Sequence, residues 1–304
     1  MSSRITGAML TGSTLNDINS ALSAMERSSS ELSSGKSILQ PSDNPYGASR
    51  AIDLQSQLDG LSSYASGIND GIAWTQTAGG AMANISSIAE RVRELVLESA
   101  NGTNNQSDLN NIATEVNQLT ESIKQDANTQ YGGQYLFSGT ASATPPYAQG
   151  EKDEFKGNTE AITRSIGPGA SVTISSELSS VLGNGAGSGD NKLLDVLRTI
   201  SQHLTEGTTE GRAALTSTDL KNLDASLESL SVAQSVTGSA TNQLQMAATR
   251  IESLENSVSK ILSNTEDTDV VKTTIAYSNQ QAAYQAALRA GANIVQESLL
   301  NFLH

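Results

Sequence analysis

The sequence predicts a mainly α-helical protein with a small β insert. Apolar residues recur at steps of three and four near both ends of the chain, and such steps place side chains on one face of a helix. Aromatic residues make up only 4% of the 304 residues, which suits slim helices that meet at narrow seams better than a thick core. Glycines and prolines punctuate short runs in the middle of the chain. We therefore expect a long antiparallel helical hairpin or bundle with paired terminal coiled-coil helices and a β-rich tip domain.

The two ends carry heptad stripes that are too thin to fold alone. The C-terminal stripe is half polar, with Ser278, Gln281 and Gln285 among its positions, so it buries little apolar surface. Such helices fold against each other or against copies of themselves, and we expect residues 1–45 and 265–304 to form an inner coiled-coil domain for assembly. The expected interface residues are Leu15, Ile18, Leu22, Met25, Leu32, Leu288, Val295, Leu299 and Phe302.

An ordered connector is expected after the first helix, which should span about residues 4–33. Gly35, Pro41 and Pro45 interrupt the helical pattern there. Proline lacks an amide donor and restricts the residue before it. We interpret residues 35–45 as this connector.

Two blocks of long helices, residues 46–140 and 190–264, should form the core. The first long helix is expected to continue to about Ser99, and a turn at residues 101–105 should lead to the next helix with Ser107 as its N-cap. That next helix carries an apolar stripe made of Leu109, Ile112, Val116, Leu119 and Ile123.

The segment between the two helical blocks differs from both. Short runs bounded by glycine and proline predict a β-rich outer insert at residues 141–189. Residues 183–189 alternate glycine with small residues, and we expect them to be a flexible exit from the insert. The helical blocks on either side are near mirror images, so the simplest arrangement folds the chain back on itself with its ends together.

Composition excludes several classes of function. The chain has no cysteine and a net charge of −14, so it offers no disulfide, no thiolate metal site and no basic surface for nucleic acid. No run of 18 apolar residues and no secretory signal is visible, so we expect no membrane span and no cleaved signal peptide. His203 has no matching serine or aspartate motif and is interpreted as a surface group. We expect no catalytic residue, cofactor or metal.

Four segments carry a resemblance to a known family. The connector resembles the spoke region of the bacterial flagellin family, and its run Pro41, Ser42, Asp43, Asn44, Pro45 is similar to the form typical of the hook-associated protein 3 branch, the hook–filament junction proteins. Position 44 is Asn where Asp is commoner in that branch. Residues 91–95 and 99–104 resemble the helical core shared by flagellins and junction proteins, and residues 133–140, 280–288 and 298–303 are similar to segments of the hook-associated branch. The resemblance is weak over residues 141–190.

This resemblance implies a non-enzymatic structural subunit of the extracellular flagellum. Such a subunit would be exported unfolded through the flagellar type III channel with the help of a cytoplasmic export chaperone. It would then form a homo-oligomeric ring between the hook and the filament, in contact with the preceding hook-associated junction protein and with filament flagellin.

Two alternatives stay open at this point. A filament flagellin would share the same terminal helices but would polymerise into the bulk filament. A secreted enzyme on a flagellin-like scaffold would need an active site in the insert, where Asp153, Glu160 and other carboxylates show no pairing that spacing alone can establish.

Overall fold

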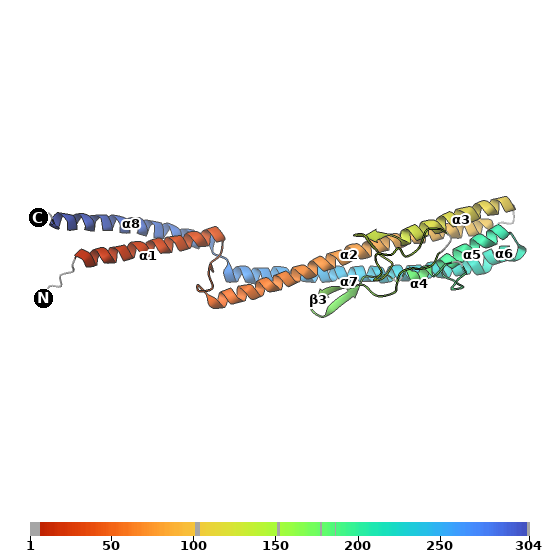
Figure 1. Ribbon diagram of the computed structural model, residues 1–304, viewed down its shortest axis with the longest axis horizontal. Coiled ribbons are helices and arrows are strands. Elements are labelled where there is room, and N and C mark those ends of the chain that lie inside the picture. Colours follow the sequence, from red (N-terminus) through yellow and green to blue (C-terminus); the bar gives the residue numbers. More distant parts are fainter. Residues whose placement is uncertain (1–6, 101–103, 151–152, 177, 186, 303–304) are drawn as a thin grey trace. The chain divides into compact units, whose positions relative to one another are not determined.

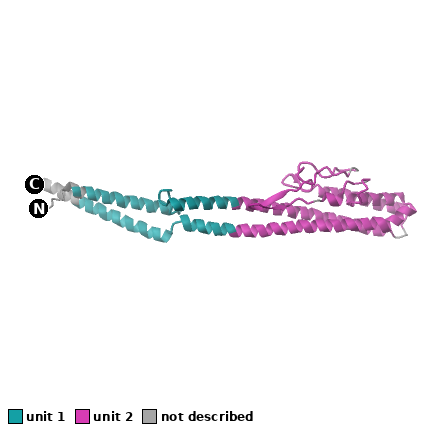
Figure 2. Ribbon diagram, turned by 90° about the horizontal axis from the view of Figure 1, so that it is seen from below, with its two compact units in different colours: residues 1–60, 254–304 teal, residues 61–253 magenta. Residues whose placement is uncertain are grey.

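The computed structural model describes residues 7–100, 104–150, 153–176, 178–185 and 187–302. Contacts divide the chain into two compact units, which Figure 2 distinguishes by colour. The first unit combines residues 1–60 with 254–304, and the second is the continuous segment 61–253. Both units are built mainly from long helices, as the sequence predicts.

The first unit brings the two ends of the chain together. Helix α1 (Gly7–Ser34) lies beside helix α8 (Val270–Phe302), as Figure 1 shows. The early part of helix α2 (Pro45–Ser99) meets the late part of helix α7 (Leu220–Glu266). The core between those two parts is small, with Ala51, Leu54 and Leu262 buried.

The second unit contains a continuous apolar core along the remainder of α2 and α7. Helix α3 (Gln106–Ala127) and helix α5 (Leu193–Glu206) pack against each other beside them. Helix α6 (Thr209–Ala214) and a short π-helical turn, η1 (Leu215–Asp219), lead from α5 into α7. The apolar stripe predicted for α3 is confirmed, because Leu109, Ile112, Val116 and Ile123 are buried and Leu119 packs against the same core.

The start of α3 corrects one sequence prediction. Asn105, not Ser107, caps the helix: its side-chain oxygen accepts a hydrogen bond from the amide of Asp108, and the Asp108 carboxylate accepts one from the amide of Asn105. This reciprocal pair forms a capping box. Ser107 lies within the first helical turn, where that role is already filled.

The segment between α3 and α5 holds two small antiparallel hairpins and a short helix. Strands β1 (Gln130–Tyr131) and β2 (Gln134–Tyr135) form the first hairpin, and β3 (Thr163–Gly167) and β4 (Ala170–Thr173) form the second. In the second hairpin Thr163 lies opposite Thr173 and Arg164 lies opposite Val172. Helix α4 (Ser179–Leu182) follows. The small β content agrees with the predicted fold class.

The glycine-rich exit at residues 183–189 makes hydrogen bonds to nearby carboxylates in the part that the structure describes, and its flexibility stays a prediction. Asp190 accepts hydrogen bonds from the amides of Asn184 and Lys192. Asp195 accepts one from the amide of Gly187. Two carboxylates near the start of α5 therefore contact the loop, which glycine composition alone could not indicate.

Candidate functional site

The pairing of α1 with α8 is the first candidate site, because it joins the chain ends that the sequence marks for assembly. The two helices are antiparallel: the Ser28 hydroxyl donates to the Gln280 side-chain oxygen at 2.7 Å, while Gly291 lies against Thr14 and Ile18. Both seams follow a strict heptad. The α1 seam is Thr14, Ile18, Ala21, Met25, Ser28 and Leu32, and the α8 seam is Thr273, Tyr277, Gln280, Tyr284, Ala287 and Gly291, all buried or half-buried where their burial is described.

Gly291 sets how closely the two helices approach. A Cβ atom at this position would lie 3.2 Å from Cγ2 of Thr14 and 3.4 Å from Cδ1 of Ile18. A larger side chain has no room there. The Ser28–Gln280 hydrogen bond adds a polar contact within the same seam, and such a contact fixes the register of paired helices.

The predicted interface residues of α1 divide between the seam and the solvent. Ile18, Met25 and Leu32 are half-buried seam residues, and Leu22 is half-buried beside the seam residue Ala21. Leu15 is 56% exposed and lies off the seam. The residue before it, Thr14, occupies the seam position instead.

The predicted stripe of α8 lies beside its seam with α1. Gln281 and Gln285 are exposed, and Leu288 is 44% exposed. Each of these follows a true seam residue by one position, as Gln281 follows Gln280. The side chains of Val295, Leu299 and Phe302 lie outside the described residues. Where it is described, the predicted α8 stripe is therefore still available for a contact beyond this chain.

The connector between α1 and α2 is held in a fixed conformation by its own polar side chains. One carboxylate oxygen of Asp43 accepts hydrogen bonds from the amides of Leu39 and Gln40. Asn44 accepts one from the amide of Gly47 and so caps the start of α2. The connector residues Pro41, Ser42, Asp43, Asn44 and Pro45 are all exposed.

The connector is also paired with the junction between α7 and α8. The amide of Ser37 donates to the carbonyl oxygen of Glu266, and the amide of Thr268 donates to the carbonyl oxygen of Gly35. The Lys36 ammonium lies 2.9 Å from the Glu266 carboxylate. These contacts join the two segments that enter and leave the α1–α8 pair.

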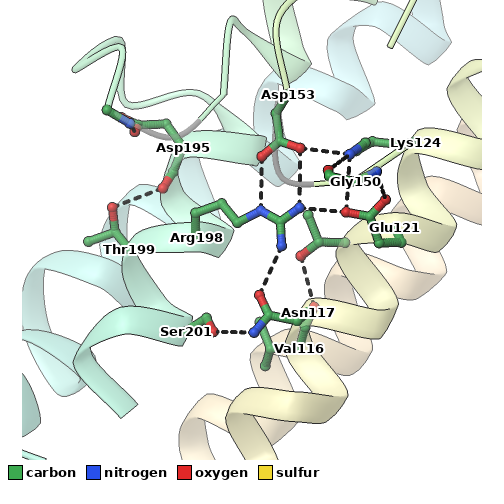
Figure 3. Close-up of polar contacts among 12 residues, drawn as sticks. Val116, Asn117, Glu121, Lys124, Gly150, Asp153, Asp195, Arg198, Thr199 and Ser201 are labelled. Carbon is green, nitrogen blue, oxygen red and sulfur yellow. Dashed lines mark hydrogen bonds and ion pairs between the residues drawn. The ribbon is translucent and has the colours of Figure 1, made fainter. Parts of the chain in front are cut away.

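A buried cluster of charges holds the insert on α3 and α5 in the second unit. Figure 3 shows Asp153 between the Lys124 ammonium, 2.8 Å from its Oδ1, and the Arg198 guanidinium, whose Nε donates to Oδ2 at 2.9 Å. The side chains of Lys124 and Asp153 are both fully buried. Glu121 accepts from both cations and from the amide of Gly150. Lys124 also donates to the carbonyl oxygen of Gly150.

The cluster keeps its two carboxylates ionised. Burial alone would raise the pKa of Asp153, but the hydrogen bonds from Arg198 and Lys124 together outweigh it and lower that pKa below its ordinary value. Burial likewise opposes ionisation of Glu121, and the hydrogen bonds from the Gly150 amide, Lys124 and Arg198 lower its pKa overall. Two cations therefore balance two anions in a site largely closed to water.

This cluster was not predicted from the sequence. Lys124 follows the seam residue Ile123, and a lysine in that place usually extends into solvent. Its partner Asp153 lies 29 positions away in a segment without regular structure. A lysine within an otherwise apolar helix face is the one signal that could have drawn attention to it.

Metal binding requires several His, Cys, Asp or Glu ligands close together in space. No group of three or more His, Asp or Glu side chains among the described residues could hold a metal ion. The carboxylates of Asp153, Asp190 and Asp195 are occupied in holding the insert. His203 is not the surface group that the sequence suggests: it is half-buried, with Nδ1 2.6 Å from Oδ2 of the buried Asp219. No helix in the described part of the chain is long and apolar enough to span a membrane.

The fold and the paired ends define a class: a protein of long helices whose N- and C-terminal helices pair with each other. Residues 5–142 match the bacterial flagellin N-terminal helical region. The chain is 38% identical over 123 residues to polar flagellin F of Vibrio parahaemolyticus, and 39% identical over 121 residues to a flagellin of Salmonella muenchen. Each match covers 40% of this chain, but only 33% and 24% of those relatives.

Solved structures share the fold over more of the chain. One described as a flagellar hook-associated protein from Vibrio parahaemolyticus aligns with a TM-score of 0.67 at 19% identity, covering 74% of this chain and 100% of that one. Hook-associated protein 3 from Legionella pneumophila aligns at 0.60 and 13% identity, covering 69% and 97%. FlgL from Bacillus cereus aligns at 0.58 and 17% identity, covering 69% and 99%. These likenesses show the fold, and they confirm the expected resemblance to the hook-associated branch.

Proposed function

We propose that this chain is a structural subunit of the bacterial flagellum that forms an adaptor ring between the hook and the filament. The flagellin family and the hook-associated proteins that it resembles are structural proteins and not enzymes. The fold it shares with three hook-associated chains, over more than two thirds of its length, favours the junction over the filament.

The observation that carries this proposal is the α1–α8 pair and what it leaves exposed. The heptad seam includes threonine, serine, glutamine and glycine, so the pair buries little apolar surface of its own. Apolar side chains remain outside the seam, with Leu15 56% exposed, Ile275 57% exposed and Leu288 44% exposed. Neighbouring copies in a ring would cover these residues, and the polar seam is suited to a helix pair that becomes fully ordered on assembly.

The proposed partners follow from this role. Each subunit would contact other copies through residues 1–45 and 265–304, with the connector at residues 41–45 as a spoke to the long-helix core at residues 46–140 and 190–264. Residues 141–189 would form the outer domain. The ring would contact the preceding hook-associated junction protein and filament flagellin. Before assembly, a cytoplasmic chaperone would assist export of the chain, which would not need a cleaved signal peptide.

Removal of α8 tests the assembly mechanism. We expect that the source bacterium producing a chain truncated after Asp269 will export flagellin without attaching filaments, so its cells will not swim. A full-length control carries Thr114→Ser, a conservative change at an exposed position of α3 in the second unit. Normal swimming of the truncated strain would overturn the terminal-helix mechanism, and loss of swimming in the control strain would show that the assay is not specific.

A filament flagellin is the second candidate. The two relatives named above, from Vibrio parahaemolyticus and Salmonella muenchen, are both flagellins. Immunogold labelling of isolated flagella separates the two roles. A junction subunit gives one band where the filament meets the hook, whereas label along the whole filament would establish the flagellin role and overturn the junction proposal.

A further inference from the structure

A second heptad stripe runs along the solvent side of α7, apart from the core seam of this helix. We call Val232, Val236, Ser239, Gln243, Met246 and Arg250 the outer stripe. All six are exposed, with Val232 at 60%, Val236 at 64% and Met246 at 66%. Their spacing of four and three places them on one face. Large apolar side chains in such a row indicate a helix face that lacks its partner.

The surface beside this stripe is hollowed at two places. One hollow of about 430 Å³ lies between Val232 and Val236 and the residues Thr173 and Ser175 at the end of β4. Another, of about 280 Å³, is lined by Met246 and by Ile166 of β3, among others. The outer stripe therefore borders two open hollows, and the insert leaves Val232, Val236 and Met246 exposed.

The outer stripe is also unusual in its charge. The chain carries 32 acidic residues, yet none falls between residues 229 and 251. The charged residues that line the hollows are Lys192 in one and Arg250 in the other, both cations. Covering this surface therefore removes few charges from water.

A second copy of this chain offers a matching surface on α2. Six residues of α2 follow one another at steps of three and four and so share one helix face. Five of them are exposed and Ala73 is half-buried; the exposed ones are Ser66, Asn69, Gln76, Gly80 and Ala83. We call these six residues the small face. Between residues 66 and 89 the only charged residue is Asp70, which is paired with Arg164. Four of the six residues, Ser66, Ala73, Gly80 and Ala83, are small and let the backbone of another helix come close. The bulky outer stripe therefore fits this face in size and in charge.

The two surfaces also lie at the same height along the second unit. Within one copy, Thr241 hydrogen-bonds to Thr75, and Gln234 hydrogen-bonds to the carbonyl oxygen of Met82. These two hydrogen bonds fix how the antiparallel helices α7 and α2 are aligned. With this alignment Val236 lies at the same position along the helices as Gly80, and Arg250 at the same position as Ser66. Copies standing side by side without an axial shift would therefore bring the outer stripe of one against the small face of the next.

We infer that the outer stripe of α7 is a side-to-side docking surface for the small face of α2 in a second copy. The contact is heterologous, since each copy contributes a different surface to each neighbour, and such contacts close into rings or continue as helices. This inference rests on the proposed self-assembly but not on the flagellar location. Assembly would then depend on the second unit as well as on the terminal helices.

Cysteine cross-linking of the purified full-length chain tests the contact, because the natural chain has no cysteine. Chains carrying Val232→Cys and tagged chains carrying Ala83→Cys are mixed at high concentration and mildly oxidised. We expect at least about tenfold more mixed dimer than from a control mixture of Val232→Cys with Thr114→Cys, an exposed position on α3. No excess over the control, or a main product joining two Val232→Cys chains, would overturn the inference.

A second pair of variants separates a lost contact from a lost fold. The reporter cysteines Met246→Cys and Asn69→Cys should also join two copies. Adding Val232→Glu and Val236→Glu to the Met246→Cys chain should abolish that product, because two charges would enter the covered face. Thr114→Glu with Gln118→Glu, two exposed changes at the same spacing on α3, should leave it intact. Equal loss of the cross-linked product with both pairs of glutamate substitutions would contradict the inference. Because no flagellum is needed, these results are independent of whether the chain sits at the junction.

Discussion

At the scale of single residues, Lys124 and Asp153 matter most for holding the insert. Both side chains are fully buried, and the hydrogen bonds around them come from α3, α5 and the insert. Removing one member of a buried ion pair leaves its partner desolvated without compensation, which costs more than the net worth of the pair. In the described part of residues 141–189 the regular elements are the β3–β4 hairpin and the short helix α4, so the cluster is a main attachment of the insert to α3 and α5.

We expect Lys124→Met to lower the free energy of unfolding by about 3 kcal/mol or more, because it leaves the charge of Asp153 and Glu121 only partly balanced by Arg198. Lys221→Met, at an exposed position on α7, is the control and should change stability by less than about 0.5 kcal/mol. Urea unfolding followed by circular dichroism measures both. Similar stabilities for the two variants would contradict the role given to the cluster.

Acid should release the same cluster. The pKa of Asp153 is lowered from an ordinary value of 3.8 and that of Glu121 from 4.5. The stabilisation from a lowered pKa is complete above the ordinary value and is lost as pH falls through the folded value. We therefore expect constant stability of the insert above about pH 5, and loss of that stability below pH 4.

Hydrogen exchange of the amides in residues 153–176, measured between pH 6 and pH 3 and corrected for intrinsic rates, checks this expectation. The variant Asp153→Asn cannot ionise at this position and should show a shallower acid dependence. An equally steep dependence in that variant would assign the acid effect to other carboxylates.

At the scale of elements, the helices could be predicted more fully than the contacts between them. The seam of α3 follows from spacing alone, because its apolar residues repeat at three and four. The seam of α1 and α8 could not be placed so well. Many of its positions are Thr, Ser, Gln or Gly, and a hydrophobicity pattern cannot separate a polar seam residue such as Gln280 from its exposed neighbour Gln281. The true seam is shown by one hydrogen bond and one close glycine contact.

The cap of α3 gives a direct comparison of two neighbouring polar residues. Asn105→Ala removes the acceptor of the Asp108 amide and should destabilise the protein by about 1 kcal/mol. Ser107→Ala should change stability by only a few tenths of a kcal/mol, because Ser107 lies inside the helix. Thermal unfolding of both variants measures the difference, and a larger effect at Ser107 would restore the sequence-based assignment.

Gly291 tests the close approach of α1 and α8. Gly291→Leu should force the helices apart, since even a Cβ there lies 3.2 Å from Thr14. Gly12→Leu on α1 is the control, because no atom lies within 4 Å of a Cβ at that position. We expect faster hydrogen exchange along α1 and α8 in the first variant only. Unchanged exchange would mean that the pair tolerates a wider separation.

At the scale of the whole molecule, the two units differ in how they are stabilised. The second unit is a continuous segment with an extended buried core that includes Trp74, Met82, Leu197 and Leu230. The first unit joins the two ends of the chain around three buried residues and a polar helix pair. Their order along the chain was predictable, because helical periodicity changes to glycine-rich runs and back. The tertiary contacts were not predictable in the same way, because the buried charges pair residues far apart in sequence, such as Lys124 and Arg198 with Asp153.

This difference predicts that the isolated chain unfolds in two steps. The α1–α8 pair buries few large apolar groups, and marginal regions open before the core does. Differential scanning calorimetry should show a low-temperature transition from the terminal pair and a higher one from residues 61–253. Deleting residues 1–34 and 270–304 should remove the first transition and leave the second almost unchanged, because the core residues of the second unit all lie outside the deleted segments. Gly291→Leu should move only the first. A single transition that shifts as a whole on deletion would mean that the terminal pair is as tightly coupled to the core as any internal helix, and ordering of the ends would then not be reserved for assembly.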